Sequence, residues 1–244
     1  MFVKDCFILS SPFFNAYSQS DLLGKIIFLG LVFLSILTWV ILLNRGYLAF
    51  KARNSAKFFE GRLTEKKGSL LSIEGLQEKN KNPYYSIFSE TRKNTLEILA
   101  KNKHFGLKGT GREEIFLSPT DVDIVESHVN TVIAKEVQDL EKNLYVLALV
   151  TALAPFLGLL GTVWGILTTF EDLTMQGGDT SHAVLQGLSL ALATTVLGLV
   201  DAIPALVGYN YLKNYIRNFS LEMECFGHKL VTDIEMHYRK VDIS

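Results

Sequence analysis

The residues of this chain best suited to chemistry are hydroxyls and one carboxyl inside long apolar segments. Thr162 and Thr195 each lie in such a segment, and Asp201 is the only acidic residue within either of them. A hydroxyl does not titrate near neutral pH, so the threonines can line a polar path but cannot carry the charge of a proton. The residue types predict a polar belt around something that passes or sits inside, with the titration supplied by a carboxylate.

Helical geometry places Thr162 on a narrow face of small and weakly polar residues, and Thr195 on a comparable face of the other segment. At about 100° per residue, the members of the face with Thr162 lie within about 40° of a common line. The two segments are antiparallel about a short connector, and a helix rises about 1.5 Å per residue, so Thr162 and Thr195 should reach a similar depth within about a turn. The first face holds Thr151, Pro155, Gly158, Thr162, Gly165 and Thr169, and the second holds Leu188, Ala191, Thr195, Ala202 and Leu206.

Close helix packing is the alternative explanation of these faces. Small residues, including Gly161 and Gly165 at a spacing of four, let helix backbones approach each other in a membrane. Packing explains the glycines better than it explains why threonines recur on the same helix face.

Asp201 also has two interpretations. An acid at the centre of a span costs about 2.5–3.5 kcal/mol on insertion scales, so a functional role is the default. The alternative is an aspartate that reaches a polar cavity or pairs with an adjacent helix. On an ideal helix Asp201 lies about 120° from Thr195, so it should face a neighbouring helix, although Pro204 can kink that helix.

Three uncharged runs predict the elements that position these residues. They cover residues 26–43, 143–170 and 183–212, and only Asp201 interrupts the last. Each is long enough to cross a hydrocarbon core, which takes about 20 residues. We expect an all-α, three-span membrane protein divided as follows: external segment 1–21, first span 22–43, cytoplasmic helical domain 44–143, second span 144–170, periplasmic connector 171–182, third span 183–212 and cytoplasmic helix 213–244.

The distribution of Lys and Arg predicts the orientation. The loop 44–143 holds 17 of them, the tail from Lys213 holds five, and the connector 171–182 holds none. Because cytoplasmic loops collect Lys and Arg, the loop and the tail should be cytoplasmic and the amino terminus external.

Apolar periodicity predicts helices in the cytoplasmic parts. Ser118 as N-cap, Pro119 and Asp121 mark the start of a helix that we expect to run unbroken through residue 170, about 75 Å in all. A second stripe follows the third span at Leu212, Ile216, Phe219, Met223, Phe226, Leu230 and Ile234. The polar, glycine-containing region 65–117 predicts short helices and loops.

Signals for enzymes, metals and cofactors are weak. The stretch from Gly106 to Arg112 lacks the order of a phosphate-binding loop, and the histidines are scattered. Cys6 and Cys225 are predicted on opposite sides of the membrane. We expect no enzymatic activity, cofactor, metal or nucleic-acid partner.

Two motifs carry a resemblance to a known family. The segments APFLGLLGTVWGI (154–166) and ATTVLGLVDAIPALVGYN (193–210) resemble the MotA/TolQ/ExbB proton-channel family. Three spans are more similar to TolQ and ExbB than to MotA, and the first span is slightly more similar to TolQ. Thr162 and Thr195 fall on the family's pore-lining threonines, and its other motif positions are matched by Pro155, Gly158, Gly161, Trp164, Gly198 and Pro204.

The resemblance implies an inner-membrane homopentamer around a TolR- or ExbD-like dimer of single-span subunits. Such an assembly couples proton flow to movement of a TolA- or TonB-like partner. The competing hypothesis is a membrane scaffold that moves no ions.

One departure concerns the acid. The family usually has a glutamate five residues before the second threonine, where this chain has Leu190, and usually alanine where it has Asp201. Asp201 lies about 20° around the helix from Leu190. The hypothesis is that the acidic group has moved about 16 Å along one helix face, as an accessory intramembrane acid.

Overall fold

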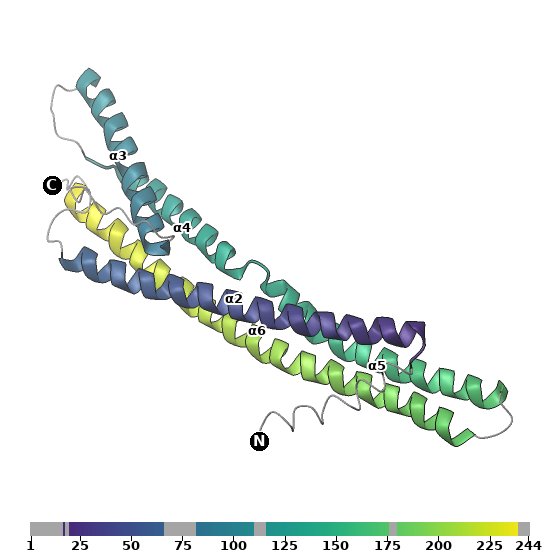
Figure 1. The fold of residues 1–244 in the computed structure, drawn as a ribbon. Coiled ribbons are helices and arrows are strands. Elements are labelled where there is room, and N and C mark those ends of the chain that lie inside the picture. The colour runs from purple at the N-terminus through teal and green to yellow at the C-terminus, as the bar shows by residue number, and fades with distance from the viewer. Residues whose placement is uncertain (1–16, 18–19, 66–81, 110–115, 176–179, 239–244) are drawn as a thin grey trace. The chain divides into compact units, whose positions relative to one another are not determined.

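The computed structural model describes residues 17, 20–65, 82–109, 116–175 and 180–238, and these are helical apart from short connecting residues such as 116–118 and 142–143. Its helices are α2 (Leu22–Glu65), α3 (Pro83–Gly109), α4 (Pro119–Glu141), α5 (Leu144–Met175) and α6 (Thr180–Tyr238) (Figure 1). Most of the predicted external segment, and residues 176–179 of the connector, lie outside the described residues.

The chain divides into two compact units. The membrane unit comprises Met1–Arg45 and Asn143–Leu212, and the bundle unit comprises Gly46–Lys142 and Lys213–Ser244. Helices α2, α5 and α6 each contain a stretch long and apolar enough to cross a membrane. The predicted all-α, three-span class is therefore confirmed.

The membrane unit packs α2, α5 and α6 around a small core. Its buried side chains are Ile27 and Leu31 of α2, Val150 and Ala154 of α5, and Ala202 and Ala205 of α6. Large apolar side chains such as Phe33, Phe156 and Ile203 point outward and are exposed, as lipid contact requires.

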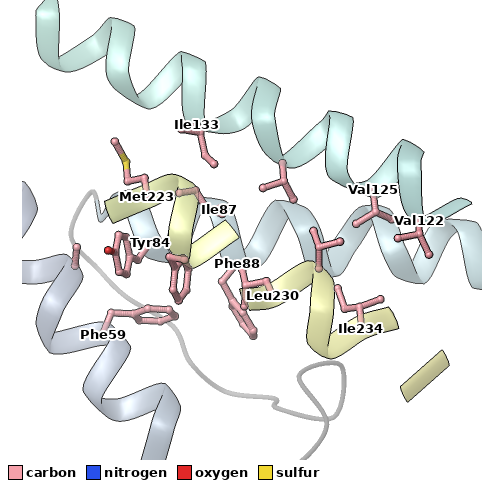
Figure 2. Packing of buried hydrophobic residues seen from close by; sticks show 14 of the residues in the cluster. Phe59, Tyr84, Ile87, Phe88, Val122, Val125, Ile133, Met223, Leu230 and Ile234 are labelled. Atoms are coloured by element: carbon pink, nitrogen blue, oxygen red, sulfur yellow. The ribbon is translucent and has the colours of Figure 1, made fainter. Parts of the chain in front are cut away.

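The bundle unit has a core of large side chains from four helical segments. Figure 2 shows Phe59 of α2 near Tyr84 and Phe88 of α3, with Leu230 of α6 and Val125 of α4 further along the same core. Tyr84 stacks on Phe226 with ring centroids 4.2 Å apart. All seven residues of the stripe predicted from Leu212 to Ile234 are buried.

The predicted start of α4 is confirmed. The Ser118 hydroxyl accepts a hydrogen bond from the Asp121 N–H, and the Asp121 carboxylate accepts one from the Ser118 N–H. Pro119 occupies the first turn, where its missing N–H has no consequence.

The prediction of one unbroken helix over residues 119–170 is wrong. Helix α4 ends at Glu141 and α5 begins at Leu144. Between them Lys142 is extended, with ψ 131°, and Asn143 is left-handed, with φ 68°. Asparagine is one of the few residues other than glycine that adopt this conformation readily, so the break is encoded by a single residue that a periodicity argument passes over.

The prediction of short helices and loops over 65–117 is wrong for residues 83–109, because α3 is a single helix of 27 residues. Residues 66–81 and 110–115 lie outside the described residues. The buried stripe of α3 includes Tyr84, Phe88, Thr91, Thr95 and Leu99. The two threonines lower the hydropathy of the stripe, so the stripe is hard to detect from the sequence. They can be buried because each hydroxyl donates to a carbonyl four residues earlier.

Candidate functional site

Helices α5 and α6 meet along a contact made of glycines. A Cβ atom added to Gly198 would lie 2.5 Å from the Ala154 carbonyl oxygen, and one added to Gly158 would lie 3.0 Å from the Thr194 carbonyl oxygen. These atoms belong to backbone, so no side-chain movement can relieve the clash. The helices can approach this closely only because both positions are glycine.

The contact continues toward the connector. A Cβ on Gly165 would lie 2.9 Å from the Gly187 carbonyl oxygen, and one on Gly161 would collide with the Thr194 side chain. We name this contact the glycine seam, formed by Ala154, Gly158, Gly161, Gly165 and Thr169 of α5 and by Gly187, Ala191, Thr194 and Gly198 of α6. Half of the small face identified on the second span, namely Gly158, Gly165 and Thr169, therefore packs against α6 of the same chain.

Hydroxyls lie within and beside the glycine seam. Thr194 is fully buried, and its hydroxyl has the Leu190 and Ala191 carbonyls at 3.1 and 3.0 Å and the Gly158 carbonyl at 3.5 Å. Thr195 is half-buried and donates to the Gly158 carbonyl at 3.3 Å. Each thus bonds to the backbone of both helices.

Thr162 is partly exposed at the margin of the seam. Its hydroxyl donates to the Leu159 carbonyl at 2.6 Å. Thr195 contacts α5 at Gly158, one turn from Thr162, so the two hydroxyls do reach a similar depth as predicted. A third hydroxyl, that of Thr168, bonds to carbonyls of its own helix two turns further along.

Trp164 joins α5 to the start of α2. Its indole N–H donates to the Asp21 carboxylate at 2.8 Å, and the other oxygen of Asp21 accepts from the Gly24 N–H at 3.0 Å. Asp21 therefore both satisfies a free N–H in the first turn of α2 and holds α5 beside it.

Asp201 faces α2, whereas Thr195 faces α5, in line with the predicted angle between them. The Asp201 carboxyl is buried and accepts a hydrogen bond from the Ser35 hydroxyl. Leu190 lies on the same side of α6, because its side chain is 2.9 Å from a Cβ added to Gly24.

Pro155 and Pro204 both lie inside helices. Each lacks an N–H, so the carbonyls of Thr151 and Val200 lose their usual partner four residues later. Among the residues with described side chains, no three His, Cys, Asp or Glu residues gather in a way that could hold a metal ion.

The sequence analysis missed four polar residues of this unit: Asp21, Ser35, Thr38 and Thr194. A signal existed for three of them. Asp21 directly precedes the first apolar run, and Ser35 and Thr38 are hydroxyls spaced three apart within it, so they share a helix face. Thr194 adjoins Thr195, and only the packing of α5 against α6 distinguishes the buried hydroxyl from the half-buried one.

Comparison with known proteins decides the family. Residues 99–225, more than half of the chain, match the sequence model of the MotA/TolQ/ExbB proton channel family. The chain belongs to this family. The matched region includes the second span, the glycine seam and most of α6.

Individual members of the family match over most of the chain. The Tol-Pal system protein TolQ of Haemophilus influenzae is 27% identical over 88% of this chain and 96% of its own length. TolQ of Pseudomonas aeruginosa is 29% identical over 79% of each chain. The biopolymer transport protein ExbB of Pseudomonas putida is 28% identical over 85% of this chain, which spans 58% of that relative's length.

Proposed function

We propose that this protein is the proton-channel subunit of an inner-membrane motor of the TolQ/ExbB type. It converts the proton-motive force into movement of a TolA- or TonB-like partner across the cell envelope. The protein assembles as a homopentamer around a dimer of TolR- or ExbD-like single-span subunits, which carry the main titrating carboxylate.

The observation that carries the proposal is the pairing of family membership with two hydroxyls at one depth. Thr162 and Thr195 lie within a turn of each other, on helices that the glycine seam holds rigidly together. Both remain partly exposed after the unit has packed, so they are free to face a bore between subunits. Fixed hydroxyls at one level can hydrogen-bond with a carboxyl or a proton-carrying water that passes them.

The proposed orientation puts the amino terminus in the periplasm and the carboxy terminus in the cytoplasm. The 17 Lys and Arg of residues 44–143 support it, because positive charge is retained on the cytoplasmic side. A proton crossing about 150 mV releases about 3.5 kcal/mol, which is enough to bias a rotating or rocking interface.

The test replaces each hydroxyl by a methyl group of the same shape. The variants Thr162→Val and Thr195→Val are expected to assemble normally with the single-span partner but to lose proton flux in proteoliposomes and coupled function in cells. Thr168→Val is the control, because the Thr168 hydroxyl, like that of Thr162, donates to carbonyls of α5 itself but lies on a different face of that helix. The Thr168→Val variant should retain both proton flux and coupled function.

The alternative function is a scaffold without ion movement. The glycine seam favours this alternative, because packing within one chain accounts for the glycines. If either valine variant fails to assemble, or if both conduct like Thr168→Val, the scaffold is the better description. Co-purification with a TolR-like or an ExbD-like subunit then separates an envelope-integrity role from an uptake role.

A further inference from the structure

Asp201 is buried inside its own protomer. Only 4% of its surface is exposed, and helix α2 covers it. Close α2–α6 contacts flank it on both sides: Gly24 meets Leu190 toward the start of α2, and Gly208 packs directly against the Leu42 side chain toward the other end. A neighbouring subunit can therefore reach this carboxyl only if α2 moves away.

Two hydroxyls of α2 share the face that covers Asp201. The Ser35 hydroxyl donates a hydrogen bond to the Asp201 carboxyl. The carboxyl oxygen Oδ2 has no hydrogen-bond partner among the described residues. Thr38, one turn further along α2, is 1% exposed, and its hydroxyl also has no described partner.

Thr38 differs from the other buried threonines of the described helices. Thr91, Thr169 and Thr194 donate to a carbonyl of the preceding turn. The Thr38 hydroxyl does not, although its own helix offers the same acceptor. A fully buried hydroxyl that leaves this bond unmade lowers the stability of the fold unless the site has another use for it.

Within the described spans, no charged side chain balances a charge on Asp201. Residues 26–44 of α2 and residues 144–170 of α5 contain none, and Asp201 is the only one in residues 183–212. The phenols of the unit lie near its ends, for example Tyr145 at the start of α5 and Tyr209 eight residues after Asp201. An ionised carboxylate without a counter-ion is very unfavourable in such a place, so the closed arrangement of α2 on α6 favours the neutral acid.

We propose that Asp201, Ser35 and Thr38 form a proton-binding site between α2 and α6, separate from the threonines of the proposed pore. The carboxyl holds a proton while the two helices are closed on each other and releases it when they part. Ser35 hydrogen-bonds to the carboxyl, and the Thr38 hydroxyl, which has no described partner and lies on the same face of α2, accepts from the acid once Oδ2 carries the proton. Proton uptake here therefore regulates the contact of α2 with α6, whether or not the protein conducts protons.

The first test is infrared spectroscopy of the full-length protein in lipid, without partner subunits. At neutral pH the wild type should show the carbonyl stretch of a protonated carboxyl shielded from water, and Asp201→Asn should lack it. Ser35→Ala and Thr38→Val should each shift the band, because each removes one hydrogen-bonding hydroxyl. Glu171→Gln, which removes an exposed acid at the end of the second span, should leave the band unchanged.

The second test follows the helix contact. Amide exchange of α2 around Ser35 and Thr38, corrected for the intrinsic rate, should accelerate by up to about tenfold per pH unit once the proton is released. In Asp201→Asn the corrected rate should be independent of pH.

The proposal is overturned if the wild type has no such band, because Asp201 is then ionised. It is also overturned if neither hydroxyl variant shifts the band, or if exchange in the wild type is as independent of pH as in Asp201→Asn. Should Asp201→Asn fail to fold, the two hydroxyl variants still decide the matter because they leave the carboxyl in place. None of these readouts depends on proton flux, so a non-conducting protein leaves the test intact.

Discussion

The glycine seam of the membrane unit and the core of the bundle unit solve the same packing problem in opposite ways. In the seam, Gly158 and Gly198 let two backbones touch. In the bundle, Phe59, Tyr84 and Phe226 fill the space between helices with rings. Burial of large apolar side chains drives association in water, but lipid is as apolar as the side chains, so helices within it gain more from close backbone approach. Helix α6 carries both solutions, small residues in its first half and rings in its second.

The largest loss of stability is expected from a substitution in the glycine seam. Gly198→Ala places a methyl group 2.5 Å from the Ala154 carbonyl oxygen, so α5 and α6 must separate along their length. We expect loss of folded protein, measured by size-exclusion chromatography and thermal unfolding in detergent. Gly30→Ala is the control, since no described atom beyond its chain neighbours and the adjacent backbone of its own helix lies within 4 Å of the added methyl group. Equal stability of the two variants would contradict the role of the seam.

The next largest effect is in the bundle unit. Phe226→Ala removes a buried ring stacked on Tyr84 and should lower the free energy of unfolding by about 3–5 kcal/mol. Chemical denaturation of the full-length protein measures the loss. Leu221→Ala, at a position that is 54% exposed, should cost far less. A Phe226→Ala protein as stable as Leu221→Ala would show that the rings are not the main source of stability in this unit.

A smaller, pH-dependent effect is expected at the start of α4. Ser118→Ala removes the N-cap and should cost about 1 kcal/mol. Burial raises the pKa of Asp121, but hydrogen bonds from the Ser118 backbone, Asn102 and the Ser118 hydroxyl outweigh it, and the net pKa is below the ordinary value. The contribution of Asp121 to stability is therefore complete above about pH 4, its value in the unfolded chain, and is lost as the pH falls through the lower folded pKa.

Unfolding measured across this acidic range checks the sign. Asp121→Asn should flatten that part of the pH profile without changing the rest. A wild-type profile that gains stability as the pH falls below 4 would be inconsistent with a lowered pKa.

The smallest effect is expected at a partly exposed ion pair of the bundle unit. Arg53 donates to the Glu222 carboxylate through Nε at 3.0 Å, and this hydrogen bond raises the pKa of Arg53. Because both side chains still meet solvent, a double-mutant cycle with Arg53→Met and Glu222→Gln should give a coupling of about 0.5 kcal/mol that salt weakens. A coupling several times larger that resists salt would mean that the pair is buried in the assembled protein.

Much of the fold could be predicted from the sequence. Uncharged runs located the three spans, and the stripe from Leu212 to Ile234 was predicted residue by residue, because hydrophobic period and span length are local properties. The break at Asn143 and the length of α3 could not be predicted in the same way. One left-handed residue interrupts no periodicity, and buried threonines such as Thr91 and Thr95 imitate a polar surface.

The candidate site could also be predicted from the sequence only in part. Residue types and spacing by themselves determined that Thr162, Thr195 and Asp201 lie in membrane spans, and that Asp201 faces away from Thr195, since a helix fixes the angle between its own residues. Only the tertiary structure decided what each residue meets: α6 against the glycines of α5, Asp21 against Trp164, and Ser35 beside Asp201. Contacts between helices depend on which faces pack together, and no local pattern within one helix contains that information.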